Sequence, residues 1–576
     1  MQYILGTNSR QTSLGLWSLE EEIAPNSPAR FVEVFAESLD IGGMGFTRST
    51  PAPTGRPPYD PRDLVKLYIY GYLNGIRSSR RLMRECERNI EVFFLLNRLR
   101  PDFRTIADFR RRHREQLRRV FLLFSRACLD MKLMDADTLC LDGTTIRAVN
   151  GKKKAVSAEL ARKKLEYARA QLEAVERYMD TLDENDLYEK DLAKPMALDL
   201  DKRHLPSVQE LRERIAFHED CLRRLAETGA GAILFTDPDA AMMPAKEGGV
   251  KACYNVQTAV DPASHLIADF TVTDHANDRG LLDPCMEQAK SELGLDRVRV
   301  IADKGYESSR DIEACLFHGT VPDVGFIYDR NERAFSLEYH GGDIAEDERL
   351  SSDPRDISRC LHAGVLPASL ENSNVRIELQ SLSSVSCFLR HEDGSVTCPM
   401  GRQLFKLKDT KYGIRYASRE ACRTCPNRCT DSSSPKEVNI GRNSTYVPVL
   451  MYGSPRFPLQ QIPTNGVSSS HLHTFGRRHK DEKRVMIFIR RDIPKQKLRQ
   501  QTSEHPFGTI KHAHGASHFL CRGKPTVTAE FALSALAYNI RRAINICGGV
   551  QELILRFKAL CREKSAKIYK HSMNSI

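Results

Sequence analysis

The stretch Thr138-Leu-Cys-Leu-Asp142-Gly-Thr-Thr-Ile-Arg147 decides the fold: it is an apolar run of strand length that ends at an aspartate. A second stretch, Val298-Arg-Val-Ile-Ala-Asp303-Lys-Gly-Tyr306, repeats this arrangement much later in the chain. Short apolar runs that stop at Asp and Gly are typical of buried strands. A carboxylate at the end of such a strand is rigidly held and open to solvent, where it can meet a hard cation. The two stretches together predict one metal centre.

A third acid, Glu504, lies in Gln501-Thr-Ser-Glu504-His-Pro-Phe-Gly-Thr-Ile-Lys511. Seven residues make about two helical turns, so Glu504 and Lys511 are expected on one face of a helix. A lone strand that ends in Asp-Gly is far more often a plain turn than a metal ligand. The prediction therefore depends on the ordered set of three contexts and not on any one of them.

In this order, Asp142-Gly-Thr, Asp303-Lys-Gly-Tyr and Glu504-His-Pro-Phe-Gly-Thr-Ile-Lys resemble bacterial insertion-sequence transposases of the DDE class. The resemblance runs from about Tyr59 to Ile546. It also includes Gly249-Val-Lys-Ala-Cys-Tyr-Asn255-Val-Gln-Thr-Ala-Val-Asp261 and Ala537-Tyr-Asn-Ile-Arg541. It implies an α/β fold with a ribonuclease H-like mixed-sheet catalytic core, an N-terminal helical domain, a helical-hairpin insertion and an irregular, cysteine-containing insertion.

The expected division of the chain follows from this resemblance and from local composition. It comprises an N-terminal segment with a Pro-rich linker (1–58), a helical DNA-binding domain (59–131), the first part of the catalytic core (132–151 and 229–328), a helical hairpin (152–228), an insertion with the cysteines (329–496), the last part of the core with the Glu504 helix (497–550) and a basic helical tail (551–576). Three short helices with outward arginines fit a helix-turn-helix-like DNA-binding domain and equally an ordinary bundle with basic surfaces.

The resemblance implies that the protein cuts and joins phosphodiester bonds at the ends of an insertion sequence. Two Mg²⁺ or Mn²⁺ ions would neutralise the attacking and leaving oxygens, with Asp142 bridging the ions and Asp303 and Glu504 completing one each. Lys511 and Arg499 would contact phosphates near the cut. The implied partner is double-stranded DNA, both the terminal repeats and the target. A homodimer is expected in the synapse, because two ends must be cut together.

The chain departs from the related signature before the glutamate. Lys497 and Gln500 stand where relatives have Tyr and Arg, and Arg499 is displaced by one position. Ser503 stands where relatives more often have an apolar residue. These changes put the positioning of phosphates in doubt, but they remove no metal ligand.

Basic residues are concentrated in two runs, although the net charge of +11 is modest for 576 residues. From Arg98 to Arg119 there are nine arginines against three acids, among them Arg110, Arg111 and Arg112. From Arg477 to Arg499 there are ten Lys or Arg, including Lys497, against three acids. A single basic run is more often a solvated helix face, but two such runs favour binding of a polyanion such as DNA.

Four cysteines are candidate zinc ligands: Cys398, Cys422, Cys425 and Cys429. A reducing compartment argues against disulfides, and four thiolates can form a closed tetrahedral zinc site. The spacing shows one Cys-x-x-Cys pair and not two, so clustered free thiols are an equal alternative, and Cys387 is a competing ligand.

The N-terminus lacks the features of a signal peptide, and no apolar run reaches membrane-spanning length, so a cytoplasmic protein, associated with the bacterial nucleoid when DNA-bound, is expected. Two other functions stay open. One is a catalytically inactive, zinc-stabilised DNA-binding protein or repressor, and the other is a nuclease of the same fold that cleaves without strand transfer.

Overall fold

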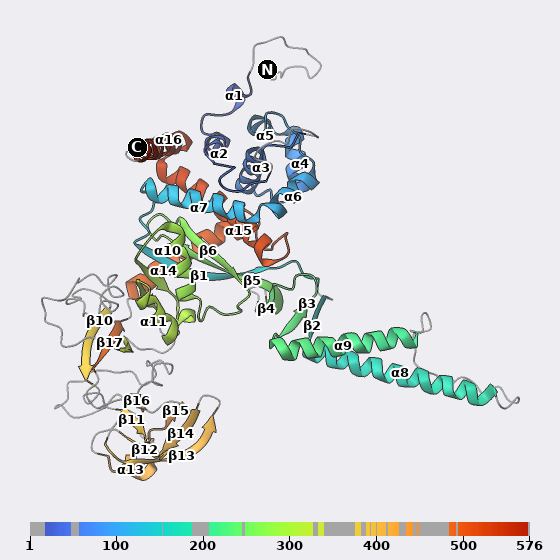
Figure 1. Cartoon of the computed structure of the whole chain (residues 1–576), viewed down its shortest axis with the longest axis vertical. Coiled ribbons are helices and arrows are strands. Elements are labelled where there is room, and N and C mark those ends of the chain that lie inside the picture. Colours follow the sequence, from blue (N-terminus) through green and yellow to red (C-terminus); the bar gives the residue numbers. More distant parts are fainter. Residues whose placement is uncertain are drawn as a thin grey trace, which may run out of the picture.

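The structure is a computed structural model of the whole chain. It describes residues 18–47, 57–151, 154–186, 207–244, 248–325, 332–338, 375–381, 387–391, 393–398, 400–410, 413–425, 434–441, 446–448, 483–490 and 493–573. Three parts are distinct in Figure 1: helices around a central mixed sheet, a projecting helical hairpin, and smaller β units. No helix in these ranges is long and apolar enough to cross a membrane.

The central sheet combines parallel and antiparallel pairs in the order β4-β5-β1-β7-β8, with β6 also paired to β5. β1 is antiparallel to β5 and parallel to β7, which in turn is parallel to β8. The strands are β1 (Thr138–Arg147), β4 (Ala241–Pro244), β5 (Val250–Val260), β6 (Ile267–Thr273), β7 (Val298–Ala302) and β8 (Thr320–Val324). This mixed α/β arrangement is consistent with the expected ribonuclease H-like core.

β1 differs from its prediction, because it does not end at Asp142. The strand continues through Gly143 to Arg147, and each residue from Asp142 onward is paired to β5. β7 does end directly before Asp303, whose side chain caps a short 3₁₀ turn at Lys304–Tyr306 by accepting from Gly305 N. The alternation of residues 252–260 and 266–273 around the turn at 261–265 predicts a β-hairpin, and the structure confirms it. β5 and β6 are antiparallel neighbours, and Asp261 caps their turn by accepting from Ser264 N at 2.7 Å.

Four helices hold the sheet in place: α10 (Leu282–Leu293), α11 (Ser309–Phe317), α14 (Ile493–Gly508) and α15 (Lys524–Cys547). α10 contacts β5, β6 and β7, and α14 contacts β1, β5 and β7. Asn539 of α15 hydrogen-bonds both backbone groups of Ile267, at 2.9 Å to the amide and 2.8 Å to the carbonyl. This side chain therefore satisfies the β6 backbone at the outer edge of the sheet.

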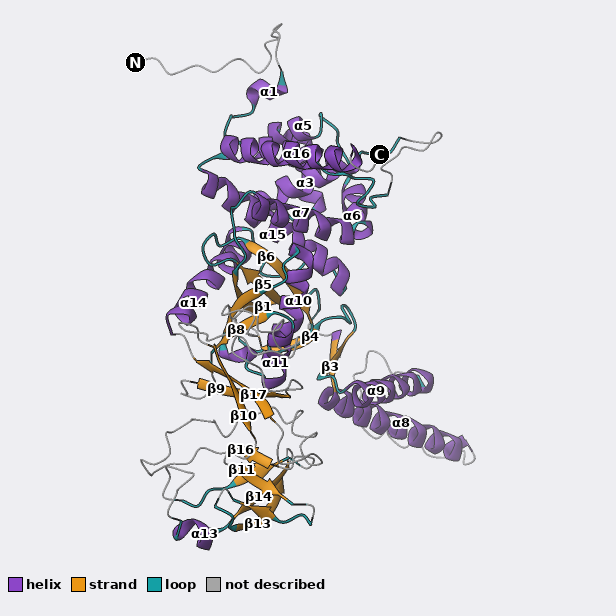
Figure 2. Ribbon diagram, turned by 60° about the vertical axis from the view of Figure 1, so that its left-hand side comes forward, coloured by secondary structure: helices purple, strands orange, loops and turns teal. Residues whose placement is uncertain are grey.

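The N-terminal helices are α1 (Leu19–Glu22), α2 (Pro28–Glu37), α3 (Pro61–Leu73), α4 (Ser79–Arg88), α5 (Ile90–Leu95), α6 (Phe103–Arg112) and α7 (Arg114–Asp130). Of these, α2, α3, α6 and α7 pack on α15 or α16 (Val550–Met573), which lie beside them in Figure 2. Rings from distant segments meet where Phe31 and Phe35 contact both Phe124 and Phe557, each pair less than 6 Å apart between centroids. Hydrophobic burial of this kind joins these helices and the sheet in one continuous core.

Capping residues explain where these helices begin. Asp60-Pro61 is a typical cap and first-turn pair, which predicts the start of a helix. The structure confirms this start, because Asp60 accepts a hydrogen bond from Arg62 N and Pro61 is the first residue of α3. Thr105, with Asp108 three residues later, predicts one helix that starts at Thr105 and runs to about Asp130. The structure shows that this prediction is wrong. Asp102 is the cap, since it accepts from the amides of Arg104 and Thr105, and the helix is broken at His113 into α6 and α7.

The helical hairpin lies between β1 and β5 in the chain and projects from the sheet in Figure 1. Its helices are α8 (Ala158–Asp186) and α9 (Val208–Thr228), closed at the base by β2 (Ala155–Ser157) paired antiparallel to β3 (Ala232–Leu234). A small apolar cluster and exposed ion pairs such as Arg169–Glu219 hold the two helices together.

The described pieces of the cysteine-containing insertion form two small sheets. β9 (Glu332–Glu338) and β10 (Val375–Ser381) flank β17 (Lys483–Arg490), which leads towards α14. A second sheet contains β11 (Cys387–Arg390), β12 (Val396–Thr397), β13 (Gln403–Thr410), β14 (Gly413–Ala417), β15 (Val438–Ile440) and β16 (Tyr446–Pro448), with α13 (Arg419–Arg423) following β14. The insertion is thus more regular in these segments than its sequence suggests.

Candidate active site

Two of the predicted acids stand on adjacent strands. Leu141 of β1 is paired in parallel with Ala302 of β7, so Asp142 and Asp303 each follow a directly paired residue. Burial raises the pKa of Asp142, and the charge of Asp303 adds to this effect, while Ser503 and Arg499 oppose it. Two carboxylates that repel one another across neighbouring strands form a site that favours a cation.

Helix α14 brings a cation to Asp142. The guanidinium of Arg499 lies 3.3 Å from Asp142 Oδ2, and both side chains are mostly buried, with 15% and 21% of their areas exposed. Ser503, one turn later on the same helix face, also lies against Asp142 and lowers its pKa. The helix that carries the third acid is therefore packed on β1 through its arginine and serine.

Glu504 itself is exposed to solvent. Among the described residues, Asp283, Glu287 and His318 form a group in which the possible metal-ligand atoms all lie within 4.8 Å of one another. This group contains none of the three predicted acids. The structure brings Asp142 and Asp303 together and places the helix of Glu504 beside them. Convergence of the Glu504 carboxylate with the two aspartates stays a prediction.

Lys511 reaches β1 two residues beyond Asp142. Its Nζ donates to Thr144 Oγ1 at 2.6 Å and to the Thr145 carbonyl at 2.9 Å. Glu504 and Lys511 do not belong to one regular α-helix, because α14 contains Pro506 and gives way to a π turn at Thr509–Ala513; their position on one face stays a prediction. Such π turns occur frequently at functional sites. Lys511 thus lies near the aspartates through a distorted helix end.

One acid at this place, Asp278 in the loop between β6 and α10, was not predicted from the sequence. Its Oδ1 accepts hydrogen bonds from Asn255 Nδ2 at 2.8 Å and from Gln257 Nε2 at 2.7 Å. Both amides are buried in β5. The signal was present in the sequence as two amide residues at alternate positions of an otherwise apolar strand, which places them on one face.

The group of Asp283, Glu287 and His318 has a simpler explanation than a metal site. His318 Nδ1 lies 2.9 Å from Asp283 Oδ1, and Lys290 Nζ lies 2.6 Å from Glu287 Oε1. The lysine ammonium already supplies a cation to this cluster, and Lys290 also donates to the His318 carbonyl.

The three predicted DNA-binding arginines of α6 differ in placement. Arg110 is buried and donates to the Tyr72 hydroxyl at 3.0 Å, so it supports the helical core and is not displayed to a polyanion, contrary to the prediction. Arg111 and Arg112 are exposed at 68% and 53% and pair with Asp108. Arg110 was misread because its partner belongs to another helix.

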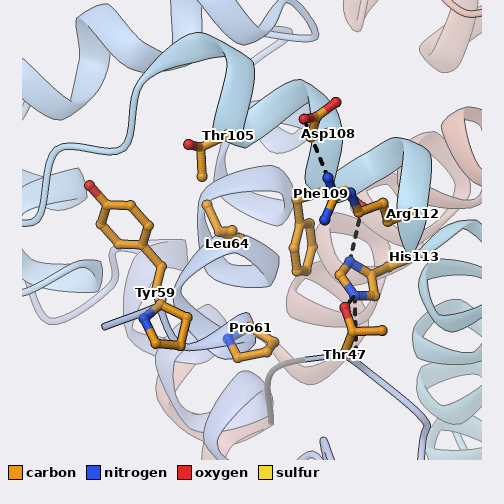
Figure 3. A pocket seen from close by; sticks show the side chains of 10 residues that line it. Thr47, Tyr59, Pro61, Leu64, Thr105, Asp108, Phe109, Arg112 and His113 are labelled. Carbon is orange, nitrogen blue, oxygen red and sulfur yellow. Dashed lines mark hydrogen bonds and ion pairs between the residues drawn. The ribbon is translucent and has the colours of Figure 1, made fainter. Parts of the chain in front are cut away.

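A hollow of about 200 Å³ lies beside Arg112 and is shown in Figure 3. Thr47 closes one side, where its backbone N and Oγ1 lie 3.1 and 2.8 Å from His113 Nε2. A neighbouring hollow is lined by Thr47, Arg111, Arg112 and Arg114. Three arginines on one concave surface suit a phosphate backbone better than an isolated basic helix face does.

The predicted zinc ligands are only partly described. Cys398, Cys422 and Cys425 are half-buried, and Cys429 lies outside the described residues. Arg402 joins the two segments that carry the described thiols, since its guanidinium donates to the Ala421 carbonyl at 2.9 Å and to Thr424 Oγ1 at 2.6 Å.

Three parts of the chain match families of known proteins. Residues 17–112 match the family described as transposase domain (DUF772), and residues 230–331 and 473–544 match two families described as transposase DDE domain. The chain carries transposase DDE domains. The DDE ranges include Asp303, Glu504 and Lys511, whereas Asp142 lies between the matched ranges. No curated protein was found to match the chain.

The DDE domains indicate a transposase function, and with it DNA binding and the use of a divalent metal ion. The residues present fit such an ion. Carboxylate oxygens are the ligands that Mg²⁺ prefers. Asp142, Asp278 and Asp303, which all lie near Tyr306, supply three carboxylates, and the guanidinium of Arg499 is a cation paired with Asp142. The chain therefore has acids of the kind that bind Mg²⁺ at and beside its central sheet.

Proposed function

We propose that this protein is the transposase of an insertion sequence, which cuts and joins phosphodiester bonds at the ends of its element. The observation that supports the proposal best is the adjacency of Asp142 and Asp303, together with the α14 residues packed against Asp142. We further propose that Asp142, Asp303 and Glu504 hold two divalent ions. When bound, these ions would activate the attacking oxygen and stabilise the leaving oxygen.

The residues of the chain would position the DNA. Lys511 has an ammonium group that could exchange its Thr144 and Thr145 contacts for a phosphate beside the scissile bond. Arg499 and Lys497, on the same helix, would contact neighbouring phosphates. Arg111 and Arg112 would contact the DNA farther away, at the concave surface that they line. A homodimer would hold two element ends together.

The test is a cleavage and strand-transfer assay with the full-length chain, terminal-repeat DNA and Mg²⁺. We expect Asp142→Asn, Asp303→Asn and Glu504→Gln each to lower the rate of cleavage by at least about a hundredfold, as the loss of charge stabilisation costs in other enzymes. Asp283→Asn, an acid-to-amide change on α10, should leave the rate unchanged. Full activity of Asp142→Asn would refute the proposal. Cleavage without a joined product would identify a nuclease of the same fold.

A second candidate function is a DNA-binding protein or repressor without catalytic activity, stabilised by zinc at Cys398, Cys422, Cys425 and Cys429. One observation favours it: Arg499, and not a third carboxylate, faces Asp142. Tight binding to terminal-repeat DNA with no nicking in Mg²⁺ or Mn²⁺ would support this candidate over the transposase.

A further inference from the structure

Asp278 lies between the two motifs that carry the catalytic aspartates. A Cβ on Gly143 would stand 2.6 Å from Asp278 Oδ1, and a Cβ on Gly305 would stand 3.5 Å from Asp278 Oδ2. The same Gly305 position is 2.9 Å from Asp303 Oδ1. Glycine at position 143 leaves the space that the Asp278 carboxylate occupies, whereas a Cβ at position 305 would be in ordinary contact with Asp278 and too close to Asp303.

Buried amides hold this carboxylate in one orientation. Asn255 and Gln257, 4% and 0% exposed, both donate to Oδ1. Gln257 is itself held by Tyr306 of the second motif, whose hydroxyl donates to Gln257 Oε1. The pKa of Tyr306 is raised well above its usual value, first by burial and then by the charges of Asp278 and Asp142, so the hydroxyl keeps the proton that it donates.

Amides orient a carboxylate without neutralising it. Within the described part of the chain, both hydrogen bonds to Asp278 come from neutral side chains and both end on Oδ1. Burying two amides in a strand costs free energy unless their hydrogen bonds are made. Two buried amides and one glycine that accommodate a single acid, next to two others, are typical of a carboxylate positioned to bind a cation.

We propose that Asp278 is a fourth acidic residue of the metal centre, which binds a divalent cation through Oδ2 together with Asp142 and Asp303. This inference rests on the proposed function. It assigns Asn255, Gln257 and Tyr306 as positioning residues, because they act on the cation only through Asp278. It also gives the glycine of the Asp142-Gly-Thr motif a physical reason, because a Cβ at position 143 would stand 2.6 Å from Asp278 Oδ1.

The experiment is a titration of the full-length chain with Mn²⁺, followed by calorimetry. Mn²⁺ is chosen because it prefers oxygen ligands over cysteine thiolates. Asp278→Asn is isosteric: its amide oxygen can still accept from Asn255 and Gln257, whereas the charge and the Oδ2 ligand are lost. We expect Mn²⁺ to bind at least about tenfold more weakly, with an unchanged melting temperature in the absence of metal.

Three further variants decide between the outcomes. Asn255→Ala removes one donor and keeps the charge, so its Mn²⁺ affinity should fall less than that of Asp278→Asn; equal losses would assign the effect to the hydrogen-bond network and overturn the inference. Asp283→Asn should bind Mn²⁺ as the unmodified chain does, and a loss there alone would place the ion at the Asp283 group instead.

Asp142→Asn separates this inference from the proposed function. In one outcome, Asp142→Asn binds Mn²⁺ weakly and fails to cleave, while Asp278→Asn matches the unmodified chain in both assays. That result would refute the role of Asp278 as a metal ligand and leave the proposed transposase function intact. If neither change alters Mn²⁺ binding or cleavage, the metal centre and the proposed function both fall.

Discussion

The guanidinium of Arg499 pairs with Asp142, a proposed metal ligand, so removing the charge of Arg499 should strengthen metal binding. Arg499→Gln keeps a polar side chain of helical propensity and deletes the cation that lies 3.3 Å from Asp142 Oδ2. Without the arginine, the potential at Asp142 and Asp303 becomes more negative. The variant should therefore bind Mn²⁺ more tightly than the unmodified chain does.

The magnitude follows from the geometry of the pair. At 3.3 Å and an effective dielectric constant of about 20, Coulomb's law gives roughly 5 kcal/mol for the bare attraction. Both side chains keep some exposure, and the arginine regains hydration when it leaves, so the net coupling should be about 1 to 2 kcal/mol. Since about 1.4 kcal/mol is a tenfold change, Mn²⁺ affinity should rise roughly 5- to 30-fold.

The assay is calorimetric titration with Mn²⁺ at constant ionic strength, and Lys497→Gln is the matched control. Lys497 is two residues away on the same helix and exposed, so its charge is screened and its removal should change the affinity less than about twofold. Strand cleavage by Arg499→Gln should nevertheless fall, because a phosphate contact is lost. Unchanged or weaker Mn²⁺ binding in Arg499→Gln would refute the competition between arginine and ion.

Three other changes test the scaffold. Arg77→Met leaves the Glu530 carboxylate buried without its cation, 3.2 Å away, and should lower the free energy of unfolding by about 3 to 5 kcal/mol in a urea titration. Burial lowers the pKa of His514 to about 4, and the charge of Arg541 adds to this effect. Because histidine in the unfolded chain titrates near 6.5, the free energy of unfolding should fall as the pH falls from about 6.5 towards 4, by roughly 3 kcal/mol at most. His514→Phe should remove this loss, as measured by urea titrations at several pH values. If Cys422 and its predicted partners bind zinc, elemental analysis should find a stoichiometric amount, and Cys422→Ser should abolish it.

Local signals in the sequence were sufficient where a single segment determines its own structure. The Asp60-Pro61 pair starts α3 because its side chain and fixed φ act within one turn, and the turn before Leu266 closes the β5–β6 hairpin by its own hydrogen bonds. The prediction of a strand that ends at Asp303 was also correct, because the aspartate caps the turn that follows the strand directly.

Features that depend on a distant partner were not predictable. Gly143 suggests a strand end when β1 is considered alone, yet pairing with β5 carries the strand past it to Arg147. Arg110 is one of several arginines in a basic run, and only Tyr72, on another helix, distinguishes it as a core residue. The position of Arg499 at Asp142 depends in the same way on how α14 packs against β1.

Arg499 should have two partners, depending on whether a metal ion is bound. It pairs with Asp142 without the ion, and it is predicted to contact a phosphate of the DNA when the ion is bound. Without a metal ion, the nearest concentrated negative charge is Asp142, and the guanidinium lies there. A bound divalent ion would cancel that attraction and leave the arginine, on a helix that also carries Lys497, to pair with a phosphate. Metal binding and DNA binding should then be coupled: Mn²⁺ should tighten the binding of terminal-repeat DNA to the unmodified chain, and this gain should shrink in Arg499→Gln. Because such coupling is reciprocal, DNA should raise Mn²⁺ affinity by the same factor. A gain in Arg499→Gln as large as in the unmodified chain would show that the arginine does not link the two sites.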